Sequence, residues 1–255
     1  MKKTCFALSA ALLVASFAAS AAEIRFGVDA SYPPFEFKAQ NGQVAGFDIE
    51  LGNEICKRLH AQCVWVENDF DGMIPALKAK KFDGILSSMS MTEQRMKEIA
   101  FSDKLFNTPT RMVAKTGSGI KPTAASLAGK RVGVEQGTIQ ETYAKTYWAP
   151  KGVEVVSYKD QNQVQSDLAA GRLDAALQDA VEASEGFLKK PEGKGYGFVG
   201  ANLVDVKTLG SGAGIGLRKE DVALKTRINK AIASMIKDGT YAKIEKKYFA
   251  FDVYN

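Results

Sequence analysis

Residues 81–95 read KFDGILSSMSMTEQR, which predicts an apolar strand, a serine-rich turn and the first turn of a helix. Thr92 is a good helix N-cap, and Glu93 suits the positive end of the helix dipole. A cation at Arg95, in the same first turn, opposes that dipole by about 0.3–1 kcal/mol. A local rule broken at the carboxyl end of a strand indicates a functional position.

The turn before Arg95 predicts a small site for a carboxylate. A guanidinium fork, the unpaired N–H groups of a helix start and nearby hydroxyls are donors that bind such a group. The hydroxyls here belong to Ser87, Ser88 and Ser90. The alternative is an exposed helix arginine that pairs with Glu93 or Glu98.

Strand and helix patterns alternate on both sides of this stretch, which favours an α/β architecture with parallel sheets. Either one large domain or two lobes fits the length. The expected strands are 24–28, 63–66, 82–86, 131–134, 153–157, 175–177 and 213–217. The expected helices are 46–59, 72–80, 139–147, 162–170, 181–188 and two lysine-rich helices at the end.

The start of the chain predicts a secretory signal peptide over residues 1–21. Lys2 and Lys3 precede an apolar run, and Ala19-Ser20-Ala21 is a small-x-small cleavage site. Without the two lysines the formal charge falls from +5 to +3. The basic residues are interspersed with acids, so we expect no nucleic-acid partner. No later segment reaches 18 uncharged apolar residues, so a soluble exported chain is expected.

Two cysteines, Cys56 and Cys63, remain after cleavage. In an oxidising compartment we expect them to form a disulfide. They make a poor metal site because His60 is the only histidine of the chain. We therefore expect no bound metal and read His60 as a surface packing residue.

A ten-residue echo predicts two equivalent lobes. LKAKKFDGIL at 77–86 aligns with LAAGRLDAAL at 168–177. Open α/β sheets bind ligands beyond the carboxyl ends of their strands. The first copy is followed there by the serine turn, and the second by Gln178 and Asp179.

Arg95 and Asp179 together predict a clamp for an amino acid zwitterion. Arg95 would bind the α-carboxylate and Asp179 the α-ammonium, with both interactions strengthened as water is excluded. The alternative for Asp179 is a helix N-cap. The turn EQGTIQ at 135–140 adds N–H groups of a helix start for the carboxylate, and it lacks the G-x-G-x-x-G pattern of a dinucleotide site.

Several motifs identify a family resemblance over the whole mature chain. They are DASYPPF at 29–35, GFDIEL at 46–51, FDGMIPAL at 70–77, SSMSMTEQR at 87–95, QGT at 136–138, AGRLDAALQD at 170–179 and DGTYAKIEKKYF at 238–249. The chain resembles the periplasmic substrate-binding proteins of ABC amino-acid importers. The resemblance is strongest to the branch that binds lysine, arginine, ornithine and histidine.

The resemblance implies a type II two-lobed fold that closes on its ligand by a hinge motion. Lobe 1 would comprise 22–108 and 210–255, and lobe 2 would comprise 112–204. Two crossing strands near 107–113 and 204–212 would form the hinge.

The resemblance also implies the residues that hold the ligand's backbone groups. Arg95, the backbone of Ser90 and the amide of Ile139 would hold the carboxylate. Asp179 and Ser88 would hold the ammonium.

For the ligand's side chain, Tyr32 and Phe70 would flank the methylene groups, with Asp29 at the cationic end, Ser87 nearby and Gln140 beside the pocket. Aromatic faces near a cation contribute about 0.5–2 kcal/mol. The alternatives are ordinary core packing for the two rings and turn capping for Asp29.

The sequence departs from its relatives at two positions of the site. Glu135 replaces an apolar residue that is common before the Q-G turn, and Ile139 replaces a frequent threonine. An extra carboxylate at Glu135 would favour a cation if it faces the cleft and would change little if it faces solvent. Ile139 loses a hydroxyl but keeps its amide.

The resemblance predicts a binding protein, without a cofactor, that captures a cationic L-amino acid and delivers it to an inner-membrane ABC permease. We expect a monomeric periplasmic protein. One alternative is a dehydratase-like enzyme on the same scaffold, for which Glu135 with Asp29 or Asp179 would have to supply acid–base chemistry. Another is the sensory domain of a receptor, which would require a membrane tether.

Overall fold

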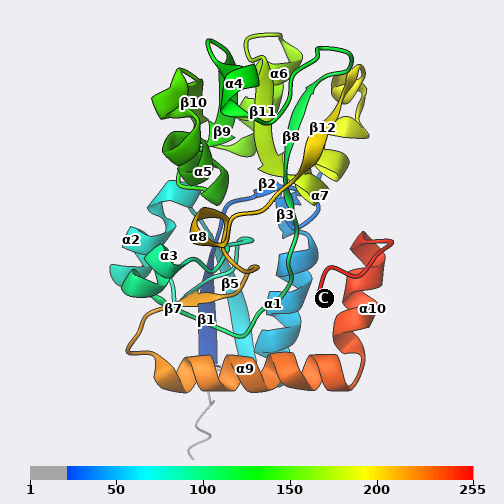
Figure 1. The fold of residues 1–255 in the computed structure, drawn as a ribbon. Coiled ribbons are helices and arrows are strands. Elements are labelled where there is room, and N and C mark those ends of the chain that lie inside the picture. Colours follow the sequence, from blue (N-terminus) through cyan, green and yellow to red (C-terminus); the bar gives the residue numbers. More distant parts are fainter. Residues whose placement is uncertain (1–21, 255) are drawn as a thin grey trace, which may run out of the picture.

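The computed structural model describes residues 22–254, so the predicted signal peptide lies outside the described residues. Two lobes, each built on a five-stranded sheet, lie one above the other (Figure 1). The first sheet has the order β5-β1-β6-β13-β7 and the second β10-β9-β11-β8-β12. A small third sheet, β2-β3-β4, belongs to the loop after β1.

The strands of the first sheet are β1 (Ala22–Val28), β5 (Ala61–Glu67), β6 (Gly84–Ile85), β7 (Ala100–Phe101) and β13 (Gly216–Leu217). Those of the second are β8 (Thr110–Lys115), β9 (Arg131–Glu135), β10 (Glu154–Tyr158), β11 (Ala175–Asp179) and β12 (Tyr196–Leu203). The small sheet contains β2 (Ser31–Tyr32), β3 (Glu36–Lys38) and β4 (Val44–Ala45).

The helices of the first lobe are α1 (Phe47–Arg58), the 3₁₀ turn η1 (Phe70–Gly72), α2 (Met73–Lys78), α3 (Glu93–Glu98), α9 (Val222–Lys237) and α10 (Thr240–Tyr248). Those of the second are α4 (Ala124–Leu127), α5 (Ile139–Tyr147), α6 (Gln161–Ala169), α7 (Ala180–Glu182) and the π-helical turn η3 (Ala183–Leu188). Two more 3₁₀ turns, η2 (Ala149–Lys151) and η4 (Pro191–Gly193), complete that lobe.

The predicted alternation of strands and helices is confirmed, with two irregular helices. The helix expected at 72–80 begins as η1 and continues as α2. The helix expected at 181–188 is a single turn, α7, followed by η3. The α/β fold class follows from this alternation.

The expectation of parallel sheets is wrong for part of each sheet. β1 pairs in parallel with β5 and β6, and β9 with β10 and β11. In contrast, β8 pairs antiparallel with β11 and β12, and β13 antiparallel with β6 and β7. β8 and β13 are the strands that follow a segment arriving from the other lobe. They enter their sheets without the helical crossover that joins parallel neighbours.

The ten-residue echo corresponds to repeated local structure. Asp83 accepts the N–H of Arg25 in β1, and its own N–H donates to the Arg25 carbonyl. Asp174 makes the same two bonds with Arg131 in β9. The aspartate of each copy therefore joins a turn to the first strand of its sheet.

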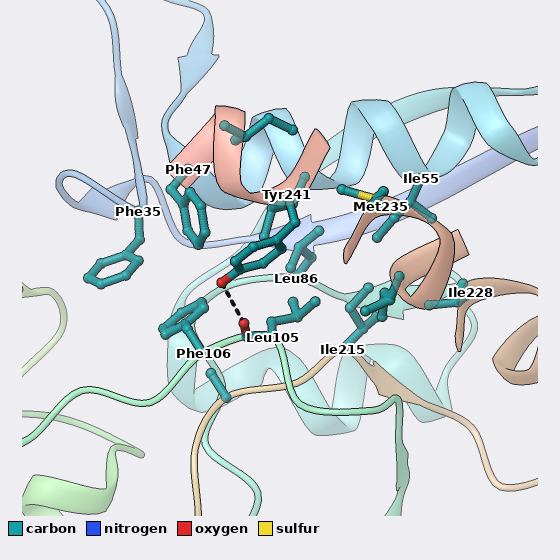
Figure 2. Close-up of a cluster of buried hydrophobic side chains, with 14 of the residues drawn as sticks. Phe35, Phe47, Ile55, Leu86, Leu105, Phe106, Ile215, Ile228, Met235 and Tyr241 are labelled. Carbon is teal, nitrogen blue, oxygen red and sulfur yellow. Dashed lines mark hydrogen bonds between the residues drawn. The ribbon is translucent and has the colours of Figure 1, made fainter. Parts of the chain in front are cut away.

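The main core of the first lobe is rich in aromatic rings (Figure 2). Phe35 stacks on Phe106 with ring centroids 4.8 Å apart, and Phe47 packs edge-on against Phe106 and Tyr241. The Tyr241 hydroxyl in α10 donates to the Leu105 carbonyl over 2.7 Å. This packing holds the end of the chain against the segment that leads toward the second lobe.

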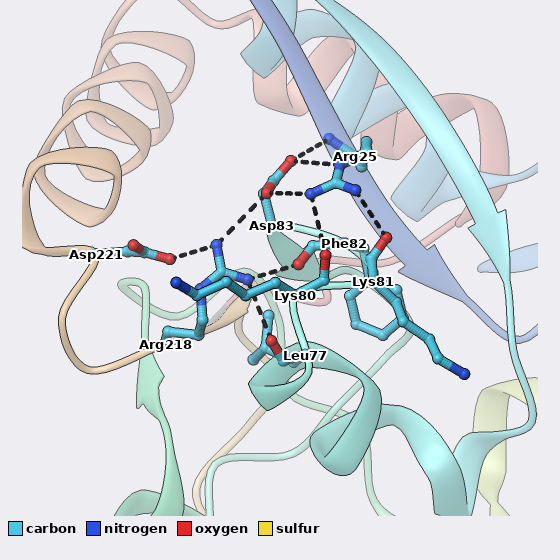
Figure 3. Close-up of polar contacts among 8 residues, drawn as sticks. All are labelled: Arg25, Leu77, Lys80, Lys81, Phe82, Asp83, Arg218 and Asp221. Atoms are coloured by element: carbon cyan, nitrogen blue, oxygen red, sulfur yellow. Dashed lines mark hydrogen bonds and ion pairs between the residues drawn. The ribbon is translucent and has the colours of Figure 1, made fainter.

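A charged network joins the returning strand β13 to the rest of its sheet (Figure 3). Buried Arg218 donates to the Phe82 and Leu77 carbonyls and lies 2.7 Å from Asp221 and 3.4 Å from Asp83. Asp83 also pairs with Arg25 at 2.9 Å. Asp83 thus connects β1, the turn before β6 and the chain after β13.

The Cys56–Cys63 disulfide is confirmed, and it joins α1 to β5. Two segments connect the lobes, residues 102–109 and 204–215, and they meet at a bridge between Phe106 and Ala213. The second segment contains a helical turn, α8 (Val206–Leu209). None of the helices within residues 22–254 has the length and apolar character that a membrane crossing requires.

Candidate functional site

A cavity of about 330 Å³ lies between the lobes, at the carboxyl ends of β1, β9 and β11. Its size falls in the usual range for small-molecule sites. All eleven residues that the sequence predicted for the ligand line it, namely Asp29, Tyr32, Phe70, Ser87, Ser88, Ser90, Arg95, Glu135, Ile139, Gln140 and Asp179. The structure therefore brings the predicted residues together at one place.

Arg95 projects from α3 into this cavity. Its Nη1 donates to the Ser90 carbonyl over 2.8 Å and its Nη2 to the Gly137 carbonyl of the second lobe over 2.9 Å. The guanidinium lies 5.4 Å from the centre of the Phe70 ring. Burial without a nearby anion lowers the pKa of Arg95 to about 10, and the group stays charged at neutral pH.

The alternative interpretation of Arg95 as a paired surface residue is wrong. Within the described part of the chain Arg95 forms no ion pair, and Glu98 pairs with Lys78 instead. The guanidinium thus keeps charge and donors available for an anion in the cavity.

Asp179, at the end of β11, is the N-cap of a helix and also lines the cavity. Its Oδ1 accepts the N–H groups of Val181 and Glu182 and so caps α7. Its Oδ2 accepts the hydroxyl of Thr108, which also lines the cavity. Burial raises the pKa of Asp179 to about 6, although these three donors favour the ionised form.

The start of α5 faces the cavity from the second lobe. Thr138 is its N-cap, and the first helical residues, Ile139 and Gln140, have N–H groups without an intrahelical acceptor. Gly137 has a left-handed φ of 78°, and a Cβ there would lie 2.7 Å from Cα of Asp71 in the first lobe. Glycine is therefore needed for both the turn and the close approach of the lobes.

The aromatic and acidic residues expected around the ligand's side chain line the cavity. Asp29 Oδ2 accepts the N–H of Phe70 over 3.1 Å, and Ser87 Oγ accepts the N–H of Asp29 over 2.9 Å. Burial raises the pKa of Asp29. Tyr32 and Phe70 each pack on a core cluster and line the cavity, so core packing and exposure to the cleft coexist.

Two buried acids behind the serine turn were missed by the sequence analysis. The Ser88 N–H donates to Asp48 Oδ2 over 2.8 Å, and its hydroxyl donates to Glu36 Oε2 over 3.1 Å. Ser88 has a φ of 49°, which is rare for serine. Burial raises the pKa of Asp48 to about 7, and burial together with the charge of Asp48 raises the pKa of Glu36 well above its usual value.

Asp48 lies in the GFDIEL motif, and Glu36 directly follows the DASYPPF motif. The signal for them was two acids among apolar residues of the YPPFEF and GFDIEL runs. The pattern alone gave no reason for these acids to meet the serine turn.

Glu135 ends β9 with its side chain buried against the cavity. Its carboxyl makes no hydrogen bond or ion pair with any residue in the range 22–254. Burial, followed by the negative charges of Asp29, Glu182, Asp160 and Asp71, raises its pKa well above the usual value.

The cavity is strongly acidic. Five of its lining residues are carboxylic acids, Asp29, Glu36, Glu135, Asp179 and Asp205, whereas Arg95 is the only cation of the described chain that lines it. No group of three or more potential metal ligands occurs among the described residues. This balance suits an organic molecule with one carboxylate and more than one positive group.

The linking segments also contribute to the cavity, which the sequence did not predict. Thr108 and Thr110 come from the first segment and the strand it enters. Val204, Asp205 and Val206 come from the second. Thr110 accepts the Gln140 amide over 3.2 Å. These residues carry no local pattern of a binding site, and only the passage between the lobes places them there.

Residues 24–251 match the model of the bacterial extracellular solute-binding proteins, family 3. The chain is 55% identical to the histidine-binding periplasmic protein of Salmonella typhimurium over 100% of this chain and 99% of that protein. It is 54% identical to the lysine/arginine/ornithine-binding periplasmic protein of Escherichia coli K12, with the same coverage.

Among solved structures, an ancestral arginine-binding protein bound to arginine superposes with a TM-score of 0.83 at 36% identity. The superposition covers 89% of this chain and 98% of that protein. These relatives are binding proteins, in agreement with the expectation that the chain is not an enzyme. The chain belongs to family 3 of the bacterial extracellular solute-binding proteins.

Proposed function

We propose that this protein captures a cationic L-amino acid, such as arginine, lysine, ornithine or histidine, and delivers it to an ABC permease of the inner membrane. The observation that carries the proposal is the charge pattern of the cavity. An unpaired Arg95 projects from one lobe, Asp179 ends a strand of the other, and further carboxyls surround the remaining space. The binding of cationic amino acids by the similar proteins supports the same ligand class.

The ligand's α-carboxylate would lie at Arg95, where the backbone of Ser90 and the Ile139 amide are also within the cavity. Its α-ammonium would pair with Asp179 and contact Ser88. Because Asp179 has one oxygen on the α7 N-terminus, the Oδ2 shared with Thr108 would receive the ammonium.

The ligand's side chain would extend between Tyr32 and Phe70 toward Asp29 and Glu135, with Ser87 and Gln140 beside it. Arg95 already lies over the Phe70 ring, so the ligand's methylene groups would complete a stack on that ring. An acidic side chain would be repelled by the two carboxyls.

Capture would involve closure of lobe 1 (22–108 and 210–255) on lobe 2 (112–204) about hinges near 107–113 and 204–212. The contacts across the cleft support this interpretation. Arg95 bonds to Gly137, and Asp69 pairs with Lys159 at 3.2 Å. In this proposal the protein is a periplasmic monomer whose signal peptide is removed near Ala21.

A thermal-shift panel of the twenty amino acids and ornithine tests the proposal. A ligand at about 100 times its dissociation constant stabilises the native state by about 2.7 kcal/mol. We expect arginine, lysine, ornithine or histidine to raise the melting temperature most and acidic amino acids to have no effect. X-ray scattering should show compaction with the best ligand. A panel in which no cationic amino acid stabilises the protein would refute the proposed function.

A further inference from the structure

Glu135 differs from the other acids that line the cavity in having no donor of its own. Its side chain is buried, 3% exposed, and its carboxyl has no polar partner in the described chain. The neighbouring acids are better solvated or paired. Asp29 accepts the Phe70 N–H, Asp160 accepts two bonds from Gln163, Glu182 accepts the Gln165 amide, and Asp71 is exposed.

Most charged groups on the elements packed around Glu135 are paired elsewhere, and Arg95 is the one unpaired cation of the described residues that shares its cavity. On α5, Lys145 is paired with Glu141 at 2.7 Å. In the neighbouring strand β10, Tyr158 directs its hydroxyl to Asp167, and in β11 Asp179 is occupied by its own donors. Burial raises the pKa of Tyr32 from the first lobe, and the negative charge of Glu135 adds to this effect. Arg95 directs its guanidinium to the Ser90 and Gly137 carbonyls. The charges that act most strongly on Glu135 belong to acids.

We infer that Glu135 holds a proton in the ligand-free cleft and releases it when a cationic amino acid binds. The inference rests on the proposed function. The Glu135 O–H bond breaks, and the proton passes to solvent. The carboxylate then accepts a hydrogen bond from the ligand's guanidinium or ammonium, which stays protonated throughout. The charged hydrogen bond from the ligand takes the place of the donor that the protein does not supply to Glu135.

The raised pKa of Glu135 agrees with this order of events. Asp29 ionises before Glu135 because it is partly exposed and already has a backbone donor. A cation in the pocket stabilises the ionised form of Glu135 and lowers its pKa. Ligand and proton therefore compete for the same carboxyl. The affinity for a cationic ligand falls by up to about tenfold per pH unit below the pKa of the free carboxyl.

The experiment is calorimetry of arginine binding at pH 7 in phosphate, HEPES and Tris, whose ionisation enthalpies differ. The dependence of the observed heat on the buffer gives the number of protons released. We expect release approaching one proton from the wild-type protein, and less with citrulline, the uncharged isostere of arginine. In Glu135→Gln most of the arginine-dependent release should disappear, although the protein still binds.

Glu36→Gln is the matched control, since it removes another buried carboxyl of the same cavity, one that accepts serine hydroxyls. The excess release with arginine over citrulline should persist in this variant. Thermal melting shows whether each variant is folded.

Two outcomes overturn the inference: equal proton release by the wild-type protein and Glu135→Gln, or no release by the wild-type protein. Absence of release from the wild-type protein overturns the inference even if a variant does not fold. Failure of the proposed function looks different, because arginine would then give no saturable heat in any buffer.

Discussion

Replacement of Arg95 by alanine should weaken ligand binding more than it weakens the fold. In the structure two of its N–H groups bind the Ser90 and Gly137 carbonyls, and the fork still faces the cavity. Two charge-assisted hydrogen bonds to a ligand carboxylate are each worth about 1.5–3 kcal/mol. Their loss predicts a decrease in binding free energy of about 3–6 kcal/mol, or roughly 10²–10⁴-fold in dissociation constant.

The bond from Arg95 to Gly137 adds to this effect, because it spans the two lobes and favours the closed state. Arg95→Lys keeps the charge but not the planar fork, so its loss should be intermediate. Isothermal titration calorimetry with arginine measures both variants, and urea unfolding without ligand measures their stability.

Arg111 offers a matched control. Its guanidinium also lies over an aromatic ring, Phe198 at 4.3 Å, and donates to a backbone carbonyl, that of Gly200, but it does not line the cavity. Because Arg111 does not line the cavity, Arg111→Ala should change stability slightly and raise the dissociation constant far less than Arg95→Ala. If Arg95→Ala bound arginine within about threefold of the wild-type protein, the proposed carboxylate site would be wrong.

Three further perturbations address separate features. Asp29→Asn should weaken arginine and lysine far more than a neutral amino acid, measured by calorimetry, and a uniform loss would remove Asp29 from the side-chain pocket. Asp83→Ala should lower the free energy of unfolding by about 2–3 kcal/mol, because it leaves buried Arg218 with fewer partners. The equivalent Asp174→Ala should lower it by about 1 kcal/mol or less. Equal losses in urea titrations would contradict this. Asp179 has a pKa raised to about 6, so it is protonated below that pH. The affinity for neutral as well as cationic amino acids should therefore fall between pH 7 and 5. If the affinity of Glu135→Gln did not change with pH, Asp179 would not pair with the ligand's ammonium.

Much of the architecture could be predicted from periodicity. The α5 helix was predicted with its observed bounds, and the disulfide followed from two cysteines in an exported chain. The antiparallel direction of β8 and β13 could not be predicted. Strand direction depends on where the chain re-enters a sheet, and both strands return from the other lobe.

The site divides in a similar way. Chemical types at strand ends, above all Arg95 and Asp179, predicted a zwitterion clamp, because strand ends and helix starts leave donors and acceptors unpaired whatever the rest of the fold. The roles of Glu36 and Asp48 depended on contacts across the chain. Both acids reach the serine turn from elements about 40 to 50 residues away.

What the sequence determined alone were properties of short segments: the strand and helix order, the repeated Asp83 and Asp174 turns and the residue types available for binding. What only the tertiary structure decided was which side chains lose water together. Sequence reasoning left open whether Glu135 faces solvent or the cleft, and the closely packed lobes place it in the cleft without a partner. Burial and the nearest charges control ionisation and affinity, and both arise from residues far apart in the chain.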